Sequence, residues 1–320
     1  MNPLLTIVIP VYNRERLIIR TLDSIAAAQK VPVSLILVDN NSSDCTRAVC
    51  DEWAALHRSA SFHIDVLEEQ RTGAPAARNW GLQHVETPYV YFFDSDDLFS
   101  TAFLSDVQSL LGVQSPVCES DLLFVPVRMR RGNRLQPRDY ERSSKPSVQI
   151  VTSMFSTHSM VFRTQWLRSI GGWDERLSIW QDWELGVRAL LHCPHILWAT
   201  DKSYHEVLLH DDSITGASAS ARWTSVLEAM KVVCQEVKDA SLISEDERRR
   251  CLRALYFRAH IHAGLLSREG CAQGASSFSV WAQEIMSSSS LAQMLYGRFL
   301  RGYTSKGGRG AWRLARCCLF

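Results

Sequence analysis

Over the first hundred residues, short apolar runs alternate with segments of helical periodicity, and this alternation constrains the fold more than any other feature. Residues 4–12 and 33–40 are nearly continuous apolar runs, as expected for parallel strands buried on both faces. Residues 62–69 and 89–94 read as two further strands. Strands that alternate with helices in this way predict an α/β fold: a doubly wound, mostly parallel, Rossmann-like sheet with flanking helices.

Three helices are expected to connect these strands. Asn13 is a candidate N-cap for the first helix and Asp44 for the second. Pro75 lies near the first turn of the third, where its missing N–H does no harm. The predicted inner face of the second helix is formed by Val49, Trp53 and Leu56.

The pattern changes after residue 120. Two strand-and-turn segments are followed by a helix at 181–192, and the sequence becomes rich in helices from about Ala221. The predicted apolar side of the 181–192 helix consists of Trp183, Val187, Leu190 and Leu191. We therefore expect a first domain at 1–217, with one half at about 1–99 and another at about 100–217, followed by a helical C-terminal segment at 218–320 with a basic tail.

Charge and cysteine content narrow the functional classes. The 35 basic residues nearly balance the 34 acidic ones, so no global field favours nucleic acid as a partner. The nine cysteines are scattered and lack the spacing of a zinc site, which favours reduced thiols. Because no apolar run reaches about 18 residues, we expect a cytoplasmic protein.

Three carboxylates, Asp94, Asp96 and Asp97, follow the apolar run YVYFF. Carboxylates clustered at a strand end suggest a hard divalent cation. An EF-hand does not fit, because its glycine would fall at Phe99 and its glutamate at Ser105. A phosphohydrolase with an Asp-x-Asp nucleophile and acid remains an alternative, as does simple capping of the next helix.

A series of motifs resembles the inverting glycosyltransferases of family 2, which have the GT-A fold. The motifs are TIVIPVYNRE, LDSI, ILVDNNSSDCT, RTGAPAARNWGL, YFFDSDD and SIGGWDERLSIWQDWELGVRAL, within roughly residues 4–210. The resemblance implies a nucleotide-sugar donor, UDP-linked by preference, and a divalent metal, Mn²⁺ or Mg²⁺. It also implies a one-step displacement with inversion at the anomeric carbon, with a nucleotide-sugar half at about 1–99 and an acceptor half at about 100–217.

The resemblance assigns donor-binding roles to Pro10, Tyr12, Asp39, Arg78, Asp94 and Ser95. Tyr12 would stack on the base, Asp39 would accept a hydrogen bond from a uracil N–H, and Arg78 would reach toward the base or phosphates. The alternatives that stay open are rim packing for Tyr12, turn capping for Asp39 and a solvated ion pair for Arg78.

The metal would be held by Asp96, Asp97 and a histidine late in the chain. HEVLLHDDSIT offers His205 and His210, and His210 matches the late His-x-x-Ser pattern of the family better. A cation there would act as a Lewis acid, because breaking the sugar–diphosphate bond loads negative charge onto the departing diphosphate.

Asp182 is the predicted general base, because it falls at the start of a helix where the dipole favours an ionised carboxylate. Glu184 lies four residues before Arg188, which suits a helix salt bridge. The family often has glutamate before the aspartate, whereas Gln181 stands here. Candidate acceptor contacts are Trp173, Trp180 and Glu184.

The C-terminal segment carries no acidic residue after Glu284, while basic and aromatic residues accumulate. Such a tail can lie on an anionic membrane surface, which would suit a glycan or lipid-linked acceptor in cell-surface polysaccharide synthesis. A catalytically silent nucleotide-sugar binding module remains a further alternative.

Overall fold

The computed structural model describes residues 2–112, 120–131, 134–137, 142–199, 205–208, 218–285 and 291–319. The chain divides into two compact units. The first consists of Met1–Tyr140, Phe155–Arg176 and Pro194–His210, and the second of Glu141–Met154, Leu177–Cys193 and Asp211–Phe320. The second unit therefore takes in two segments from the middle of the chain, whereas the sequence places a single division after residue 217.

The first unit is built on a seven-stranded sheet in the order β3-β2-β1-β4-β8-β5-β9. β1 to β4 run parallel to one another, and β8 is antiparallel to both of its neighbours. The strands are β1 Leu5–Val11, β2 Val33–Asp39, β3 Phe62–Glu68, β4 Tyr89–Phe92, β5 Leu122–Phe124, β8 Met160–Arg163 and β9 Ile196–Trp198. A second sheet has the order β10-β6-β7, with β6 Val127–Arg131, β7 Arg134–Pro137 and β10 His205–Leu208. The mostly parallel sheet predicted from the sequence is confirmed.

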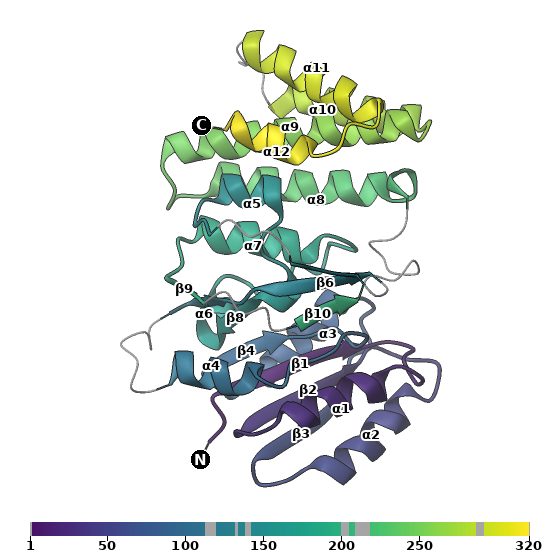
Figure 1. The fold of residues 1–320 in the computed structure, drawn as a ribbon, viewed down its shortest axis with the longest axis vertical. Coiled ribbons are helices and arrows are strands. Elements are labelled where there is room, and N and C mark those ends of the chain that lie inside the picture. Colours follow the sequence, from purple (N-terminus) through teal and green to yellow (C-terminus); the bar gives the residue numbers. More distant parts are fainter. Residues whose placement is uncertain are drawn as a thin grey trace. The chain divides into compact units, whose positions relative to one another are not determined.

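Helices flank this sheet (Figure 1). They are α1 Ile18–Ala28, α2 Thr46–His57, α3 Ala74–Gln83, α4 Phe103–Leu111, α6 Thr164–Ser169 and the 3₁₀ helix η1 Thr157–Ser159. α3 lies directly on β1 and β2 because Gly81 has no side chain: a Cβ there would lie 2.4 Å from Cγ1 of Val8 and 3.2 Å from Cγ2 of Val38. This close packing fixes the depth of the helix that carries Arg78.

Three local predictions in this unit are wrong. Asp44 is not the N-cap of α2, since Cys45 occupies that position. Asn13 does not cap α1, which begins at Ile18; it has φ 51°, and its Oδ1 accepts a hydrogen bond from the Ser43 N–H at 2.9 Å. Leu56 is 76% exposed. Cys50 and Ala54 take its place beside Trp53 on the buried face of α2.

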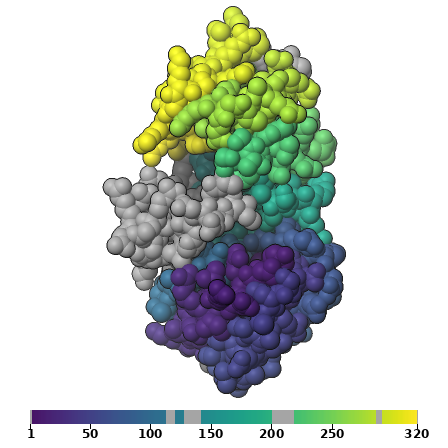
Figure 2. Space-filling model, turned by 90° about the vertical axis from the view of Figure 1, so that its right-hand side faces the viewer, coloured from purple at the N-terminus to yellow at the C-terminus, as the bar shows by residue number. Residues whose placement is uncertain are grey.

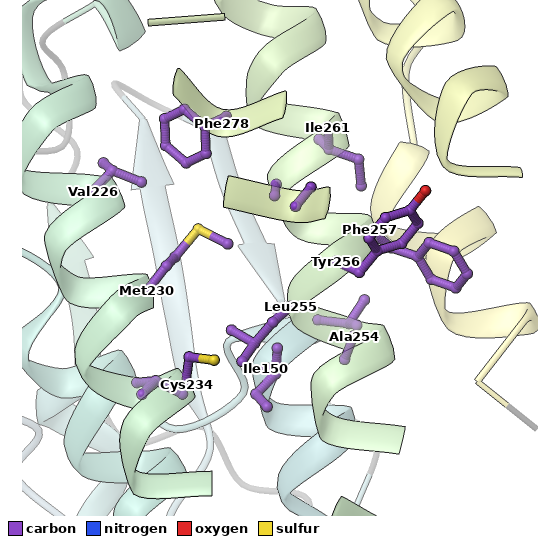
Figure 3. Close-up of a cluster of buried hydrophobic side chains, with 14 of the residues drawn as sticks. Ile150, Val226, Met230, Cys234, Ala254, Leu255, Tyr256, Phe257, Ile261 and Phe278 are labelled. Carbon is purple, nitrogen blue, oxygen red and sulfur yellow. The ribbon is translucent and has the colours of Figure 1, made fainter. Parts of the chain in front are cut away.

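The second unit is helical. Its helices are α5 Pro146–Thr152, α7 Gln181–Leu191, α8 Ala219–Asp239, α9 Glu245–Arg268, α10 Ala272–Ile285, α11 Leu291–Ser305 and α12 Ala311–Cys317. Ile150 of α5, Met230 of α8 and Phe257 of α9 meet in its core (Figure 3). The predicted apolar side of α7 is confirmed, since Trp183, Val187, Leu190 and Leu191 are all buried.

α11 and α12, which are yellow, form part of the face shown in Figure 2. Among the helices of the described ranges, none combines the length and the apolar character needed to span a lipid bilayer.

Candidate functional site

Three neighbouring strands of the first unit end at the same edge of the sheet. β1 lies between β2 and β4, and its last residue, Val11, pairs with Asp39 at the end of β2. The chain passes from β1 to β2 and β3 on one side, then continues with β4 on the other. This reversal of strand order marks the crevice in which open α/β sheets bind ligands. Tyr12, Asp39 and the Asp94–Asp97 segment all follow these strand ends.

Asp39 has a carboxylate oxygen that no group in the described part of the chain contacts by a hydrogen bond. The residue is 4% exposed, and its Oδ2 accepts a hydrogen bond from the Ser42 N–H at 3.2 Å. Its Oδ1 is buried and receives no hydrogen bond from any group in the described parts of the chain. Since buried acceptors are nearly always paired, this oxygen is suited to a donor on a ligand. Tyr12 is 55% exposed, so its ring is free to stack, and Pro10 is half-buried in β1.

Asn40 connects the loops around Asp39 by hydrogen bonds, and this role was not predicted from the sequence. Its Nδ2 donates to the carbonyl oxygens of Glu69 at 3.0 Å and Arg71 at 2.7 Å, and its Oδ1 accepts from the Gly73 N–H at 2.8 Å. The ends of β2 and β3 are thereby joined to the start of α3.

The loop that carries the three carboxylates is held by α1. The Thr21 hydroxyl lies 3.0 Å from the carbonyl oxygens of both Ser95 and Asp97, and the Ser24 hydroxyl accepts from the Phe99 N–H at 2.9 Å. Ser95 is 8% exposed. The carboxylates therefore project from a backbone whose position is fixed by hydrogen bonds.

Each carboxylate of this loop has a cationic neighbour. Asp94 accepts a hydrogen bond from Nη2 of Arg78 at 2.8 Å. Asp96 lies 3.7 Å from Nη2 of Arg14. Nε2 of His158 lies 3.0 Å from Asp97 and 3.7 Å from Asp94.

These contacts move the pKa values in different directions. Burial opposes ionisation of Asp94, but His158 and Arg78 outweigh it and hold the pKa of that carboxyl below its usual value. Burial, together with Asp94 and Asp97, raises the pKa of Asp96. Burial also opposes the charged form of His158, yet the two aspartates raise its pKa to about 9. Before any cation binds, the imidazolium of His158 thus neutralises part of the negative charge.

Asp94, Asp97 and His158 form a candidate metal centre. Each offers one ligand atom, and these atoms lie within 4.8 Å of one another. Two carboxylates and an imidazole suit a divalent ion such as Mn²⁺. Of the predicted ligands, Asp97 belongs to this cluster, Asp96 faces Arg14, and His210 lies outside the described residues.

His158 was not identified as a ligand from the sequence. It stands in η1, before β8, about sixty residues after the aspartates, and only the pairing of β8 with β4 brings it near them. The available signal was weak, namely a histidine just before a short apolar run.

Trp173 supports Arg78 from the inside of the unit. The Arg78 guanidinium lies 4.5 Å from the centre of the Trp173 ring, which meets Phe92 edge-on and is 2% exposed. Asn79 holds the loop of Trp173, accepting from the Trp173 N–H and donating to its carbonyl oxygen, both at 2.8 Å. The buried ring offers no surface to a sugar, which corrects the predicted acceptor contact of Trp173.

The remaining predicted residues belong to the second unit. Asp182 is the second residue of α7 and is partly exposed. Glu184 is fully buried, and its Oε1 accepts from Nε of Arg188 at 2.5 Å. The predicted salt bridge is thus confirmed, whereas a contact of Glu184 with the acceptor is wrong because no part of the residue reaches the surface. Trp180 is partly buried and precedes α7.

A family model, described as glycosyl transferase family 2, matches residues 6–171, more than half of the chain. The chain belongs to this family. Its relatives include the minor teichoic acid biosynthesis protein GgaA of Bacillus subtilis, 26% identical over 55% of this chain and 41% of that protein. Another is the poly(ribitol-phosphate) β-N-acetylglucosaminyltransferase TarS of Staphylococcus aureus, 23% identical over 74% of this chain and 41% of TarS. The chain thus spans about two fifths of the length of each.

Solved structures support the GT-A fold of this family 2 chain. A crystal structure of S. aureus TarS in complex with UDP-GlcNAc has a TM-score of 0.64 at 17% identity, covering 89% of this chain and 92% of that one. The mannosyltransferase PcManGT of Pyrobaculum calidifontis, in complex with GDP-Man and Mn²⁺, has a TM-score of 0.60 at 16% identity, covering 99% and 87%. Family membership accounts for the Asp-x-Asp motif without the phosphohydrolase alternative.

Proposed function

We propose that this family 2 chain is a metal-dependent inverting glycosyltransferase that transfers a sugar from a UDP-linked donor to a glycan or lipid-linked acceptor of a cell-surface polymer. The observation that carries the proposal is the convergence of Tyr12, Asp39 and the Asp94–Asp97 carboxylates at the ends of three adjacent strands. A nucleotide base needs a stacking ring and a hydrogen-bond acceptor, and a diphosphate needs a cation that carboxylates hold in place.

The base of the donor is assigned to Tyr12 and Asp39. The unpaired Oδ1 of Asp39 accepts the N3–H of uracil, and the exposed ring of Tyr12 covers one face of the base. Cytosine has no N–H at this position, which favours UDP over CDP. The TarS complex with UDP-GlcNAc supports the choice of a uridine nucleotide.

The diphosphate is assigned to the carboxylate loop through Mn²⁺ or Mg²⁺. Asp94, Asp97 and His158 are one ligand set, and Asp96 lies in the same loop. When bound, the ion offsets the negative charge that develops on the departing diphosphate. Arg78, held between Asp94 and Trp173, is a further cation for the phosphates.

Asp182 is assigned as the general base that accepts the proton of the acceptor hydroxyl. Its partial exposure and its position in the first turn of α7 support this role, because the helix dipole stabilises an ionised carboxylate there. Glu184 and Trp173 are left out of the acceptor site because both are buried.

The acceptor is assigned to the teichoic acid class, on the names of GgaA and TarS. Contact with the inner face of the membrane is assigned to α11. Its exposed apolar side chains fall three, four and eight residues after the first, which places them on one side of the helix. They are Leu291, Met294, Leu295 and Phe299. The charge of this segment fits an anionic lipid surface, since no acidic residue follows Glu284.

The test measures transfer and donor binding separately. Asp182→Asn keeps the size of the side chain but cannot take the proton, so single-turnover transfer should fall by roughly 10²–10⁴-fold. Calorimetric affinity for the UDP-sugar in Mn²⁺ should persist, and it should be lost in EDTA because diphosphate and carboxylates then repel each other. Unchanged donor affinity in EDTA would contradict the metal, and full transfer by Asp182→Asn would contradict the base.

A further inference from the structure

Trp180 has an unusual backbone conformation next to the proposed base. It is the N-cap of α7, with φ 60° and ψ 25°. A left-handed backbone at a bulky residue is a strained conformation, and it persists only where its surroundings impose it. Asp182 is two residues further on, and its Oδ1 accepts a hydrogen bond from the Trp183 N–H at 2.8 Å.

Arg258 of α9 is the centre of those surroundings. Its guanidinium carbon lies 4.4 Å from the centre of the Trp180 ring, and 4.8 Å from those of Trp183 and Trp312. Such distances are typical of cation–π contacts. Two of these tryptophans flank Asp182 in the sequence, one on each side. The planar guanidinium therefore contacts the tryptophan two residues before the base and the tryptophan directly after it.

Hydrogen bonds tie the same group to the end of α5. Nη1 of Arg258 donates to the Ile150 carbonyl oxygen at 2.5 Å and to the Ser153 hydroxyl at 3.2 Å. Nε1 of Trp183 donates to the same carbonyl oxygen of Ile150 at 3.3 Å. Ile150 thus fixes the relative positions of Arg258 and Trp183.

The charge of Arg258 needs an explanation, because a buried cation is costly without a counter-ion. The residue is 5% exposed, and within the described ranges no carboxylate forms an ion pair with it. Burial lowers its pKa to about 9, which leaves it charged at neutral pH. A well-packed apolar side chain would fill this space without that cost. The aromatic faces and the carbonyl oxygen compensate the charge, and they do so at the N-terminus of α7.

We propose that Arg258 is a positioning residue for the transfer reaction: it holds Trp180 in the left-handed conformation and Trp183 against the end of α5, and so fixes the carboxylate of Asp182 between them. The inference rests on the proposed role of Asp182 as the base. It makes α9, in the helical C-terminal segment, a part of the machinery for acceptor activation.

The first test compares Arg258→Met with a control on the same helix. Methionine keeps much of the side-chain length but not the planar charge, so kcat should fall roughly ten- to a hundred-fold, the usual effect of a misplaced catalytic group. The UDP-sugar affinity should stay unchanged. Arg249→Met is the control, since this arginine is 61% exposed and pairs with Glu245 and Asp246 on α9 itself; it should leave both quantities unchanged.

A double variant separates positioning from general destabilisation. If Arg258 acts through Asp182, adding Arg258→Met to Asp182→Asn should lower transfer by less than about two-fold, whereas independent effects would multiply. A full multiplicative loss would overturn the inference. If Asp182→Asn loses transfer while Arg258→Met keeps it, the inference fails and the proposed function stands. If Asp182→Asn keeps transfer, the assignment of Asp182 as the base fails, and the inference about Arg258 fails with it.

If Arg258→Met does not fold, Arg258→Lys takes its place in the test, because lysine keeps the positive charge but lacks the planar guanidinium. A normal kcat in Arg258→Lys would refute the positioning role, and a tenfold loss of kcat would support it.

Discussion

The unpaired oxygen of Asp39 makes nucleotide preference a test of the donor site. In Asp39→Asn the amide oxygen can keep the bond from the Ser42 N–H, which now reaches Oδ2 at 3.2 Å. The amide nitrogen then occupies the place of the buried Oδ1, which has no partner among the described residues. The variant thus presents a donor where the native protein presents an acceptor. Uracil carries an N–H at N3, whereas cytosine carries a lone pair there.

The magnitude follows from the charge of the acceptor. A hydrogen bond to a charged group contributes about 1.5–3 kcal/mol, so its loss should weaken UDP binding by roughly 10- to 150-fold. The donor–donor contact in the variant adds to this loss. CDP should respond in the opposite sense, because the new amide N–H can donate to N3 of cytosine. The ratio of the two dissociation constants should therefore change by more than either constant alone.

Isothermal calorimetry with UDP and CDP in Mn²⁺ measures both constants. Asp65→Asn is the matched control, because it removes the same charge from the exposed side of β3. Its UDP affinity should equal that of the native protein. If Asp39→Asn keeps native UDP affinity, or weakens UDP and CDP equally, then Oδ1 of Asp39 does not contact the base.

Three further predictions concern the second unit. Glu184→Gln should lower the free energy of unfolding by about 1.5–3 kcal/mol in urea titrations, because it removes a buried charged hydrogen bond to Arg188, which keeps Glu236 at 3.4 Å; a change below about 0.5 kcal/mol, as for a surface pair, would contradict this. Burial lowers the pKa of His260 to about 4, so the unfolded chain takes up a proton at a higher pH than the folded one. The free energy of unfolding should therefore fall by about 3 kcal/mol between pH 6.5 and pH 4, and His260→Leu should remove this dependence on pH. Leu295→Asp, on the exposed face of α11, should reduce sedimentation with anionic vesicles but not with neutral ones, and equal binding to both would leave α11 without a lipid role.

The sheet and the place of the site could be predicted because both depend on local patterns. β1, β2 and β4 are apolar runs, Asp39 is the last residue of β2, and Asp94 comes two residues after the end of β4. Parallel strands bring their carboxyl ends to one edge, so the convergence of these residues needed no knowledge of side-chain packing.

The other parts of the site depend on contacts between distant segments. His158 reaches Asp97 only through the pairing of β8 with β4, and Asn79 reaches the Trp173 loop across more than ninety residues. Arg258 lies in a helix that reads as ordinary core, and its ring contacts come from α7 and α12. A single sequence carries little information about such contacts between distant segments. The errors have the same origin: Glu184 was placed near an acceptor from its position in the motif, while its burial is set by the packing of α7.

Gly81 is a position outside the proposed site at which we expect mutations to be poorly tolerated. It contacts no proposed ligand group, yet any side chain there would collide with Val8 beneath α3. Alanine at this position would lift the helix from β1 and carry Arg78, one turn earlier, away from Asp94. In a library of random variants, position 81 should therefore behave like an active-site position, and only a compensating smaller residue at position 8 should restore variants that carry alanine there.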